Sequence, residues 1–238
     1  YQGHTSKTFN VHVRDDDKEY DRDYAEMDAM MHKAITIIQF KVEGQLIKKH
    51  PEWNMKERLL LDKIDYKQGT IKLGGKEYPL NDTYFPTIDP KDPYKLTHEE
   101  EDVVERLKNS FLGSERLQRH IRFLYTKGSL YKVYNGNLLY HGCVPLNEDG
   151  SFMKVRIFDK TYSGKALYDI LEHYARKGYY SIDPQEKQRG EDILWFIWKN
   201  KHSPVFGKER MATFERYFID ATETHEEPKN AYYRLFEK

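Results

Sequence analysis

One stretch decides the fold of the middle of this chain: Leu130-Tyr131-Lys132-Val133-Tyr134-Asn135-Gly136-Asn137-Leu138-Leu139-Tyr140-His141-Gly142-Cys143. Two short runs rich in aromatic and branched side chains flank Asn135-Gly136, a pair that is typical of a two-residue type I′ turn. The stretch therefore predicts an antiparallel β-hairpin. His141 lies on the returning strand, just past its apolar part.

His141 is the first candidate for a functional residue. The strand would hold the imidazole on a rigid element, and Gly142 lets the backbone turn away and leaves room beside the ring. Proteins offer a histidine to a metal ion at the rim of a sheet in this way. The alternative is a hydrogen-bonded, partly buried histidine. The residues alone favour that alternative, because one ligand does not make a metal site.

Charge and composition limit the classes of function. The chain has 238 residues, 39 Lys and Arg, 39 Asp and Glu, and therefore a formal net charge of zero. Proteins that bind nucleic acid by neutralising phosphates usually have a basic excess, so we expect no nucleic-acid partner. The 19 Tyr and 12 Phe suit a globular protein with aromatic packing. The length allows one large domain or two small ones.

Cysteine usage and the chain ends suggest the compartment and the extent of the protein. Cys143 is the one cysteine in the sequence, so we expect no disulfide within the chain and a cytoplasmic location. No apolar run approaches membrane-spanning length, so we expect no membrane partner. The chain opens with Tyr1 and ends with Lys238. We expect it to be a segment of a longer protein.

Helices dominate the first half of the sequence. Residues 1–22 are polar and indicate an arm or loop, and a helix is expected from about Asp23 to Pro51. Its apolar residues recur at three- and four-residue steps, which places on one face Met27, Met31, Ala34, Ile35, Ile38, Val42 and Leu46. A short helical piece around 55–64 and a hairpin over 70–78 follow.

Further helices and strands are expected downstream. Thr97 and Glu100 form a capping box that begins a helix, which Gly113 interrupts before the pattern continues to Gly128. A strand follows around 153–157. Ser163 can cap the next helix and Gly178 can close it, and the apolar run 193–198 predicts a buried helix.

Short motifs for a complete metal site are absent from the sequence. A two-metal phosphoesterase usually carries Asp-x-His, Gly-Asp-x-x-Asp-Arg and Gly-Asn-His motifs, and none is present. Asp21-Arg22 and Gly3-His4-Thr5 are partial matches of a length expected by chance. Cys143 could act as a nucleophile beside His141, but a small buried residue is the more common outcome.

A basic loop offers a second candidate site. Residues 203–210 combine Gly207 with cationic side chains, and Lys208, Arg210 and the later Arg216 could hold phosphate oxygens through charge-assisted hydrogen bonds. The spacing is not that of a P-loop. A solvated loop with a structural arginine is the alternative.

Several long stretches together resemble the class 3 fructose-1,6-bisphosphatases of firmicute-type bacteria. The matches run in order from about Met31 to Tyr233, and the stretches that carry them are 31–35, 38–41, 58–64, 127–131, 134–143, 206–208, 213–218, 223–225 and 229–230. Long ordered matches of this kind are more specific than any short motif. The missing metal motifs of that family would lie upstream and downstream of the matching region.

The resemblance implies an α/β fold of α+β character, part of a calcineurin-like two-sheet sandwich flanked by helices. Residues 1–22 would be an arm, and 23–238 an incomplete segment of one metallophosphoesterase domain with a helical insertion at about 23–128. The implied activity is metal-dependent hydrolysis of the 1-phosphate of fructose 1,6-bisphosphate in gluconeogenesis, usually with manganese. His141 would be a metal ligand, and no catalytic residue is identifiable in this segment.

Two other functions stay open at this point. The segment could be a non-catalytic binding module, or it could belong to a metallophosphoesterase that acts on phosphoproteins. The sequence also leaves a homo-oligomer open. Substrate profiling would separate a sugar bisphosphate from a phosphoprotein substrate.

Overall fold

The computed structural model describes residues 22–237, and it confirms the expected mixture of helices and strands. In this part of the chain the strands form three small antiparallel sheets. Their place in a larger two-sheet sandwich concerns the complete domain and stays a prediction. Residues 1–21, which include all but the last residue of the expected arm 1–22 and the partial motifs around His4 and Asp21, lie outside the described part.

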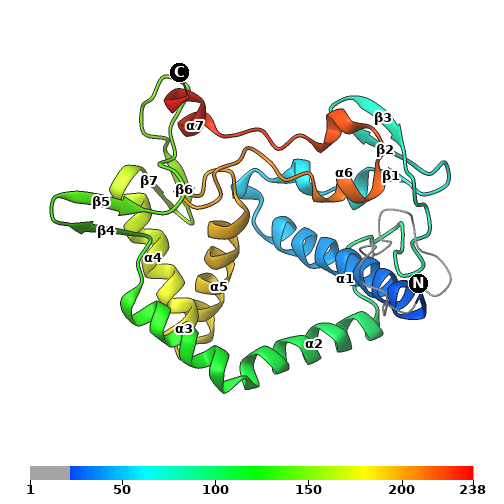
Figure 1. The fold of residues 1–238 in the computed structure, drawn as a ribbon, viewed down its shortest axis with the longest axis horizontal. Helices are drawn as coiled ribbons and strands as arrows, with labels where there is room; N and C mark the ends of the chain where they lie inside the picture. The colour runs from blue at the N-terminus through cyan, green and yellow to red at the C-terminus, as the bar shows by residue number, and fades with distance from the viewer. Residues whose placement is uncertain (1–21, 238) are drawn as a thin grey trace. The chain divides into compact units, whose positions relative to one another are not determined.

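The described chain forms two compact units, whose elements are labelled in Figure 1. Unit 1 comprises the described residues up to Arg106 together with Ala212–Glu226. Unit 2 comprises Leu107–Met211 together with the residues from Glu227 onward. None of the described helices is long and apolar enough to cross a lipid bilayer.

Unit 1 contains one long helix, a small sheet and several short turns. The expected hairpin is confirmed as β2 and β3, and β1 pairs with the free edge of β2. Where one short helical piece was expected around 55–64, the chain instead makes separate 3-10 turns. The elements are α1 (Arg22–Lys49), η2 (Pro51–Trp53), η3 (Lys56–Arg58), η4 (Leu61–Lys63), β1 (Ile64–Asp65), β2 (Thr70–Leu73), β3 (Lys76–Pro79), α6 (Thr213–Phe218) and η5 (Thr222–His225).

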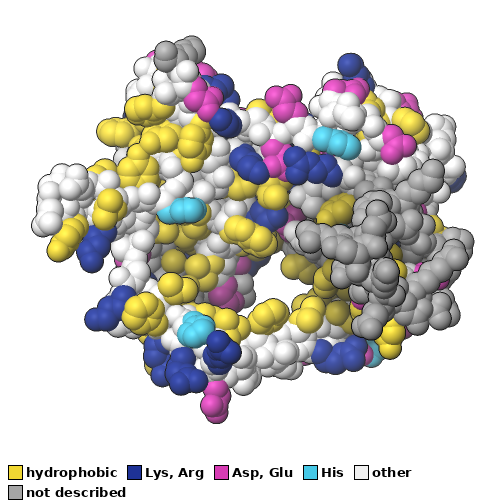
Figure 2. Space-filling model, viewed as in Figure 1, with side chains coloured by type: hydrophobic (Ala, Val, Ile, Leu, Met, Phe, Trp, Pro, Cys, Tyr) yellow, Lys and Arg dark blue, Asp and Glu magenta, His cyan; other side chains and the backbone are white. Residues whose placement is uncertain are grey.

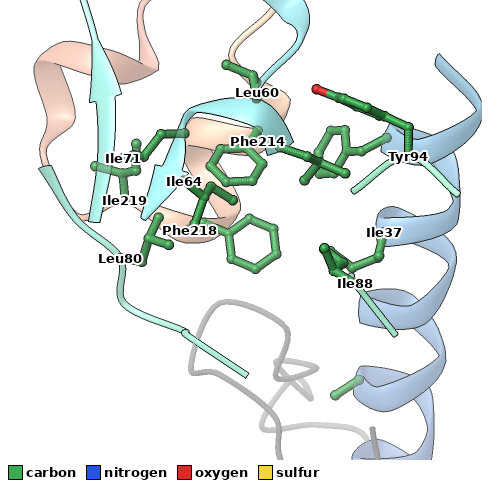
Figure 3. Packing of buried hydrophobic residues seen from close by; sticks show 13 residues of the cluster. Ile37, Leu60, Ile64, Ile71, Leu80, Ile88, Tyr94, Phe214, Phe218 and Ile219 are labelled. Atoms are coloured by element: carbon green, nitrogen blue, oxygen red, sulfur yellow. The ribbon is translucent and has the colours of Figure 1, made fainter. Parts of the chain in front are cut away.

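A cluster of buried apolar side chains joins α1, the sheet and α6 (Figure 3). Phe214 and Phe218 of α6 are fully buried, and their ring centroids lie 4.7 Å apart. Ile37 of α1 and Ile71 of β2 are also fully buried. Each such side chain contributes about 1.5–3 kcal/mol relative to exposure. The C-terminal segment 212–226 is therefore held in unit 1 by its aromatic side chains.

The helix expected from Asp23 is confirmed as α1, but much of its expected apolar face is exposed. Met27, Met31, Ile35 and Val42 are all more than one third exposed, whereas Ile38 is buried. The side that faces the core of unit 1 carries two fully buried lysines beside its apolar residues. A pattern that counts only apolar residues therefore places the buried face incorrectly.

The two buried lysines are stabilised by partners that lie far away in the sequence. Lys33 Nζ is 2.6 Å from Asp82 and donates to the Tyr84 carbonyl, and burial lowers the pKa of its ammonium group. Lys41 Nζ is 2.6 Å from Glu100 and donates to the Thr87 carbonyl. A buried charge is tolerated only when it is paired and hydrogen-bonded in this way.

The predicted helix pair after Leu96 is confirmed as α2 (His98–Gly113) and α3 (Glu115–Lys127). Thr97 and Glu100 form the expected capping box, with the Thr97 amide 2.9 Å from the Glu100 carboxylate and the Glu100 amide 3.3 Å from the Thr97 hydroxyl. Ser114 caps α3 by accepting a hydrogen bond from the Leu117 amide. The interruption therefore falls at Gly113-Ser114, as the sequence indicated.

Unit 2 contains the hairpin that was predicted first. Asn135 and Gly136 have φ values of 49° and 74°, as a type I′ turn requires, and Tyr131 pairs with Tyr140 across the ladder. Apolar side chains of the hairpin reach the surface, which Figure 2 shows around β4 and β5. Besides α3 and the part of α2 from Leu107 onward, the elements of this unit are β4 (Tyr131–Tyr134), β5 (Asn137–Tyr140), β6 (Val155–Ile157), β7 (Lys160–Tyr162), α4 (Gly164–Tyr180), α5 (Pro184–Lys199) and α7 (Ala231–Phe236).

Helices α4 and α5 cross at two glycines. A Cβ atom on Gly190 would lie 2.1 Å from the Gly178 nitrogen, so the two backbones touch where no side chain fits. The prediction that Gly178 closes α4 is therefore wrong, because the helix continues to Tyr180 and Gly178 serves the crossing. The buried helix expected at 193–198 is confirmed in α5, although Trp198 is 63% exposed.

Candidate functional site

The end of β5 places His141 at the surface of unit 2. His141 is exposed and directly follows Tyr140, the last residue of the strand. Gly142 has a φ of 88°, and a Cβ atom there would lie 2.4 Å from the Pro204 carbonyl oxygen. Only glycine fits this close approach without strain. The chain therefore turns sharply after His141 and packs its next residues against the loop 203–207.

Cys143 joins three segments behind this turn. Its amide donates to the Pro204 carbonyl over 2.7 Å, and its carbonyl accepts a hydrogen bond from the Tyr168 hydroxyl of α4 at 2.8 Å. Asn230 Nδ2 donates to the Cys143 sulfur over 3.0 Å. The thiol is fully buried, and burial raises its pKa. The expectation that Cys143 is a small buried residue is confirmed. A buried neutral thiol is a poor nucleophile.

Tyrosines hold the backbone on both sides of His141. The Tyr140 and Tyr232 hydroxyls are 2.5 Å apart, and the Tyr233 hydroxyl donates to the Gly142 carbonyl over 3.1 Å. Both residues of the pair 232–233 belong to the short helix α7. The imidazole of His141 is thus presented from a strand end that is anchored on either side.

The surroundings of His141 leave its ring available. Among residues 22–237, no side chain forms a hydrogen bond or ion pair with this imidazole. Within the same range, no three His, Cys, Asp or Glu side chains come together in a way that could hold a metal ion. An accessible imidazole on a rigid strand end suits one metal ligand, and the other ligands would have to come from elsewhere.

The basic loop lies beside the His141 turn, but its predicted phosphate ligands differ in their surroundings. Lys208 forms an ion pair with Glu227, which also belongs to unit 2. Arg210 is partly buried in the same loop. Arg216 lies on α6 in unit 1, where its guanidinium donates to the His225 carbonyl over 3.2 Å. The structure therefore brings the loop of Lys208 and Arg210 to the His141 turn through the Cys143–Pro204 hydrogen bond.

A cavity of about 240 Å³ in unit 2 contains functional candidates that the sequence did not single out. Pro145 and Leu146, which closely follow His141 in the chain, form one wall, and Lys201, His202 and Asn230 line other parts of it. Burial, with a smaller effect from the Lys201 charge, lowers the pKa of His202 to about 4. No sequence pattern marked Lys201 or His202 as functional, because residues from separate parts of the sequence line this cavity.

Comparison with known proteins identifies relatives over the whole chain. A family model described as firmicute fructose-1,6-bisphosphatase matches residues 1–238. A class 3 fructose-1,6-bisphosphatase of Clostridium beijerinckii is 52% identical over 235 residues, which is 99% of this chain and 35% of the relative. That of Clostridioides difficile is 58% identical over 210 residues, which is 88% of this chain and 32% of the relative. No solved structure matches the chain.

Proposed function

The chain belongs to the firmicute fructose-1,6-bisphosphatase family, and on that premise we propose that the protein takes part in hydrolysis of the 1-phosphate of fructose 1,6-bisphosphate, a step of gluconeogenesis. The family match over all 238 residues carries this proposal. The chain spans about a third of the length of the curated relatives that it matches. We therefore propose this activity for a protein of the full length of those relatives, and not for these 238 residues alone.

A divalent metal, with manganese as our first choice, is the cofactor that this activity requires. His141 is the residue of this chain that would hold it, because its ring is exposed, anchored and without a described partner. A bound divalent metal supplies a water of lowered pKa and positive charge next to the phosphate. His141 would contribute one ring nitrogen, and Gly142 would let the backbone of Pro204 and Val205 pack directly against the turn that follows His141.

The cationic residues Lys208, Arg210 and Arg216 are proposed to compensate phosphate charge. The loop of Lys208 and Arg210 is held next to the His141 turn, which supports their role more directly than that of Arg216. Lys208 would have to exchange its ion pair with Glu227 for a phosphate oxygen. An ammonium group can do so because both partners offer charge-assisted hydrogen bonds of similar strength.

The experiment that tests this proposal is His141→Ala in the full-length protein. We expect turnover of fructose 1,6-bisphosphate and bound manganese to fall by about 100-fold or more, because even residues that only orient a metal ligand change affinity or activity by ~10–100-fold. The fold should persist, since His141 is exposed. His120→Ala, at another exposed histidine of unit 2, is the matched control. Normal turnover of His141→Ala at saturating manganese would contradict the proposal.

Substrate profiling separates this function from the two alternatives. The names of the relatives favour a sugar bisphosphate over a phosphoprotein. Full-length protein should therefore release phosphate from fructose 1,6-bisphosphate faster than from phosphopeptides at equal concentration. Release from phosphopeptides alone would favour a phosphoprotein phosphatase, and release from neither would favour a binding module. We also propose a cytoplasmic location, which the single buried cysteine supports.

A further inference from the structure

The segment 228–233 of unit 2 is attached to the basic loop. The Glu209 amide donates a hydrogen bond to the Pro228 carbonyl over 2.8 Å. Two residues further along the segment, the Asn230 amide donates to the Gly207 carbonyl over 3.3 Å. Both bonds join backbone atoms, so they do not depend on side-chain rotamers. The backbone of the basic loop is therefore fixed relative to this segment.

The same segment also reaches the turn that follows His141. The Tyr233 hydroxyl donates to the Gly142 carbonyl over 3.1 Å, and Asn230 Nδ2 donates to the Cys143 sulfur over 3.0 Å. Burial raises the pKa of the Tyr233 hydroxyl, so this group keeps its proton and remains a donor. The segment thus holds the basic loop by its backbone and the His141 turn by its side chains.

Tyr233 contacts both of these parts at a glycine. Gly207 has a φ of 71°, and a Cβ atom there would lie 2.9 Å from Tyr233 Cε2 and 3.2 Å from the Tyr233 hydroxyl. The aromatic ring therefore packs directly on the backbone of the residue before Lys208. The hydroxyl of the same side chain binds the backbone of Gly142, the residue after His141. One side chain consequently spans the two places where the chain carries its proposed metal ligand and its proposed phosphate cation.

The separation of these two places matters for the proposed chemistry. Groups that act on one substrate must be held within about 0.5 Å of their productive geometry. The His141 ring forms no hydrogen bond with a side chain of residues 22–237, so its position depends on the backbone that carries it. A contact that fixes this backbone relative to the basic loop therefore acts on the geometry of the site.

We propose that Tyr233 is a positioning residue, which sets the place of His141 relative to Lys208 without touching metal or phosphate itself. The inference rests on the proposed function and deepens it, because it assigns a residue that holds the metal ligand and the phosphate cation in register. The hydroxyl positions His141 through Gly142, and the ring positions Lys208 through Gly207.

Manganese titration of the full-length protein tests the role of the hydroxyl. Tyr233→Phe removes the bond to Gly142 and keeps the ring. It should weaken manganese binding by about tenfold, the lower end of the ~10–100-fold effect of residues that orient a metal ligand. The matched control is Tyr66→Phe in unit 1, where the lost hydroxyl donates to the Leu61 carbonyl over 3.0 Å. The control removes the same kind of bond and should bind manganese as the wild type does.

Phosphate titration at saturating manganese tests the role of the ring. Tyr233→Phe should bind inorganic phosphate with wild-type affinity, because its ring still packs on Gly207. Tyr233→Ala removes the ring and should weaken phosphate binding by about tenfold, the usual effect of losing one hydrogen bond to a charged group. This separation of metal and phosphate affinity would not arise from a general loss of stability.

Two results would overturn the inference. One is wild-type manganese affinity of Tyr233→Phe. The other is an equal loss of manganese affinity in Tyr66→Phe, because it would show that any lost tyrosine hydrogen bond has this effect.

Amide hydrogen exchange keeps the inference separate from the proposed function. The Cys143 amide donates to the Pro204 carbonyl, and its exchange in metal-free protein reports opening of the turn. Tyr233→Phe should speed this exchange by about fivefold, the factor for one ordinary hydrogen bond. If His141→Ala loses manganese but Tyr233→Phe matches the wild type in affinity and exchange, the function holds and the inference fails. If His141→Ala binds manganese normally, the function fails, and faster exchange at Cys143 would still support Tyr233 as the residue that positions the turn.

Discussion

Replacement of Gly142 by alanine tests how tightly the backbone beside His141 is constrained. Gly142 has a φ of 88°, a conformation that costs an L-residue about 1–2 kcal/mol. Its new methyl group would also lie 2.4 Å from the Pro204 oxygen and 2.9 Å from the Val205 Cα. Both are backbone atoms, so no rotation of a side chain can relieve the overlap.

The magnitude follows from these two terms and from the unfolded chain. Relief of such an overlap by displacement of packed segments typically costs about 1–3 kcal/mol. Alanine also restricts the unfolded chain, which offsets about 0.4–1 kcal/mol. We therefore expect Gly142→Ala to lower the free energy of unfolding by about 3 kcal/mol. The displaced turn should also reduce manganese binding, because His141 precedes it directly.

Gly136→Ala is the matched control. Gly136 has a similar φ of 74°, but a Cβ atom there would meet no other atom within 4 Å. Its cost should be about 1 kcal/mol, the backbone term alone. Urea unfolding followed by circular dichroism gives both values, and titration with manganese gives the metal affinity. Equal destabilisation by the two substitutions would refute the close approach of Gly142 to the loop 203–207.

Two further predictions concern the helix crossing and the buried histidine. Alanine normally favours a helix over glycine by ~1 kcal/mol. Gly190→Ala should nevertheless destabilise the protein by about 1–3 kcal/mol in urea unfolding, because its Cβ would lie 2.1 Å from the Gly178 nitrogen. Gly113→Ala is the control and should be neutral or stabilising, because no atom lies within 4 Å of its added Cβ. A Gly190→Ala protein as stable as the wild type would show that α4 and α5 are not in contact at Gly190. The pKa of His202 is about 4 in the folded protein and 6.5 in the unfolded chain. The free energy of unfolding is therefore highest above pH 6.5 and falls as the pH decreases toward 4. The loss is about 3 kcal/mol at most. Unfolding of His202→Gln should therefore depend less on pH in this window than that of the wild type, and identical pH profiles would contradict the buried neutral ring.

Local sequence determined the elements that depend only on neighbouring residues. Asn135-Gly136 specifies a type I′ turn because both residues tolerate positive φ, and the hairpin around it follows. Thr97 and Glu100 begin α2 because their side chains satisfy backbone amides within one turn. The position of His141 at the end of β5 follows from the same hairpin. Long ordered stretches of sequence also identified the family, which the comparisons confirm.

Tertiary structure decided which faces and which residues became buried. The core-facing side of α1 includes Lys33 and Lys41, because Asp82 and Glu100 reach them from distant parts of the sequence. Gly178 looked like a helix end, and only its contact with Gly190 shows that it serves a helix crossing. No local pattern contains this information, since it depends on the partner that each residue meets.

The candidate site was also determined partly by the sequence alone and partly by the tertiary structure. The sequence by itself determined that His141 ends a strand before a glycine, since a turn and a strand need only neighbouring residues. Only the tertiary structure brought Cys143, Pro204 and Asn230 together and so formed the cavity that Lys201 and His202 line. The cost of burying polar groups depends on partners distant in sequence, and those partners are set by packing.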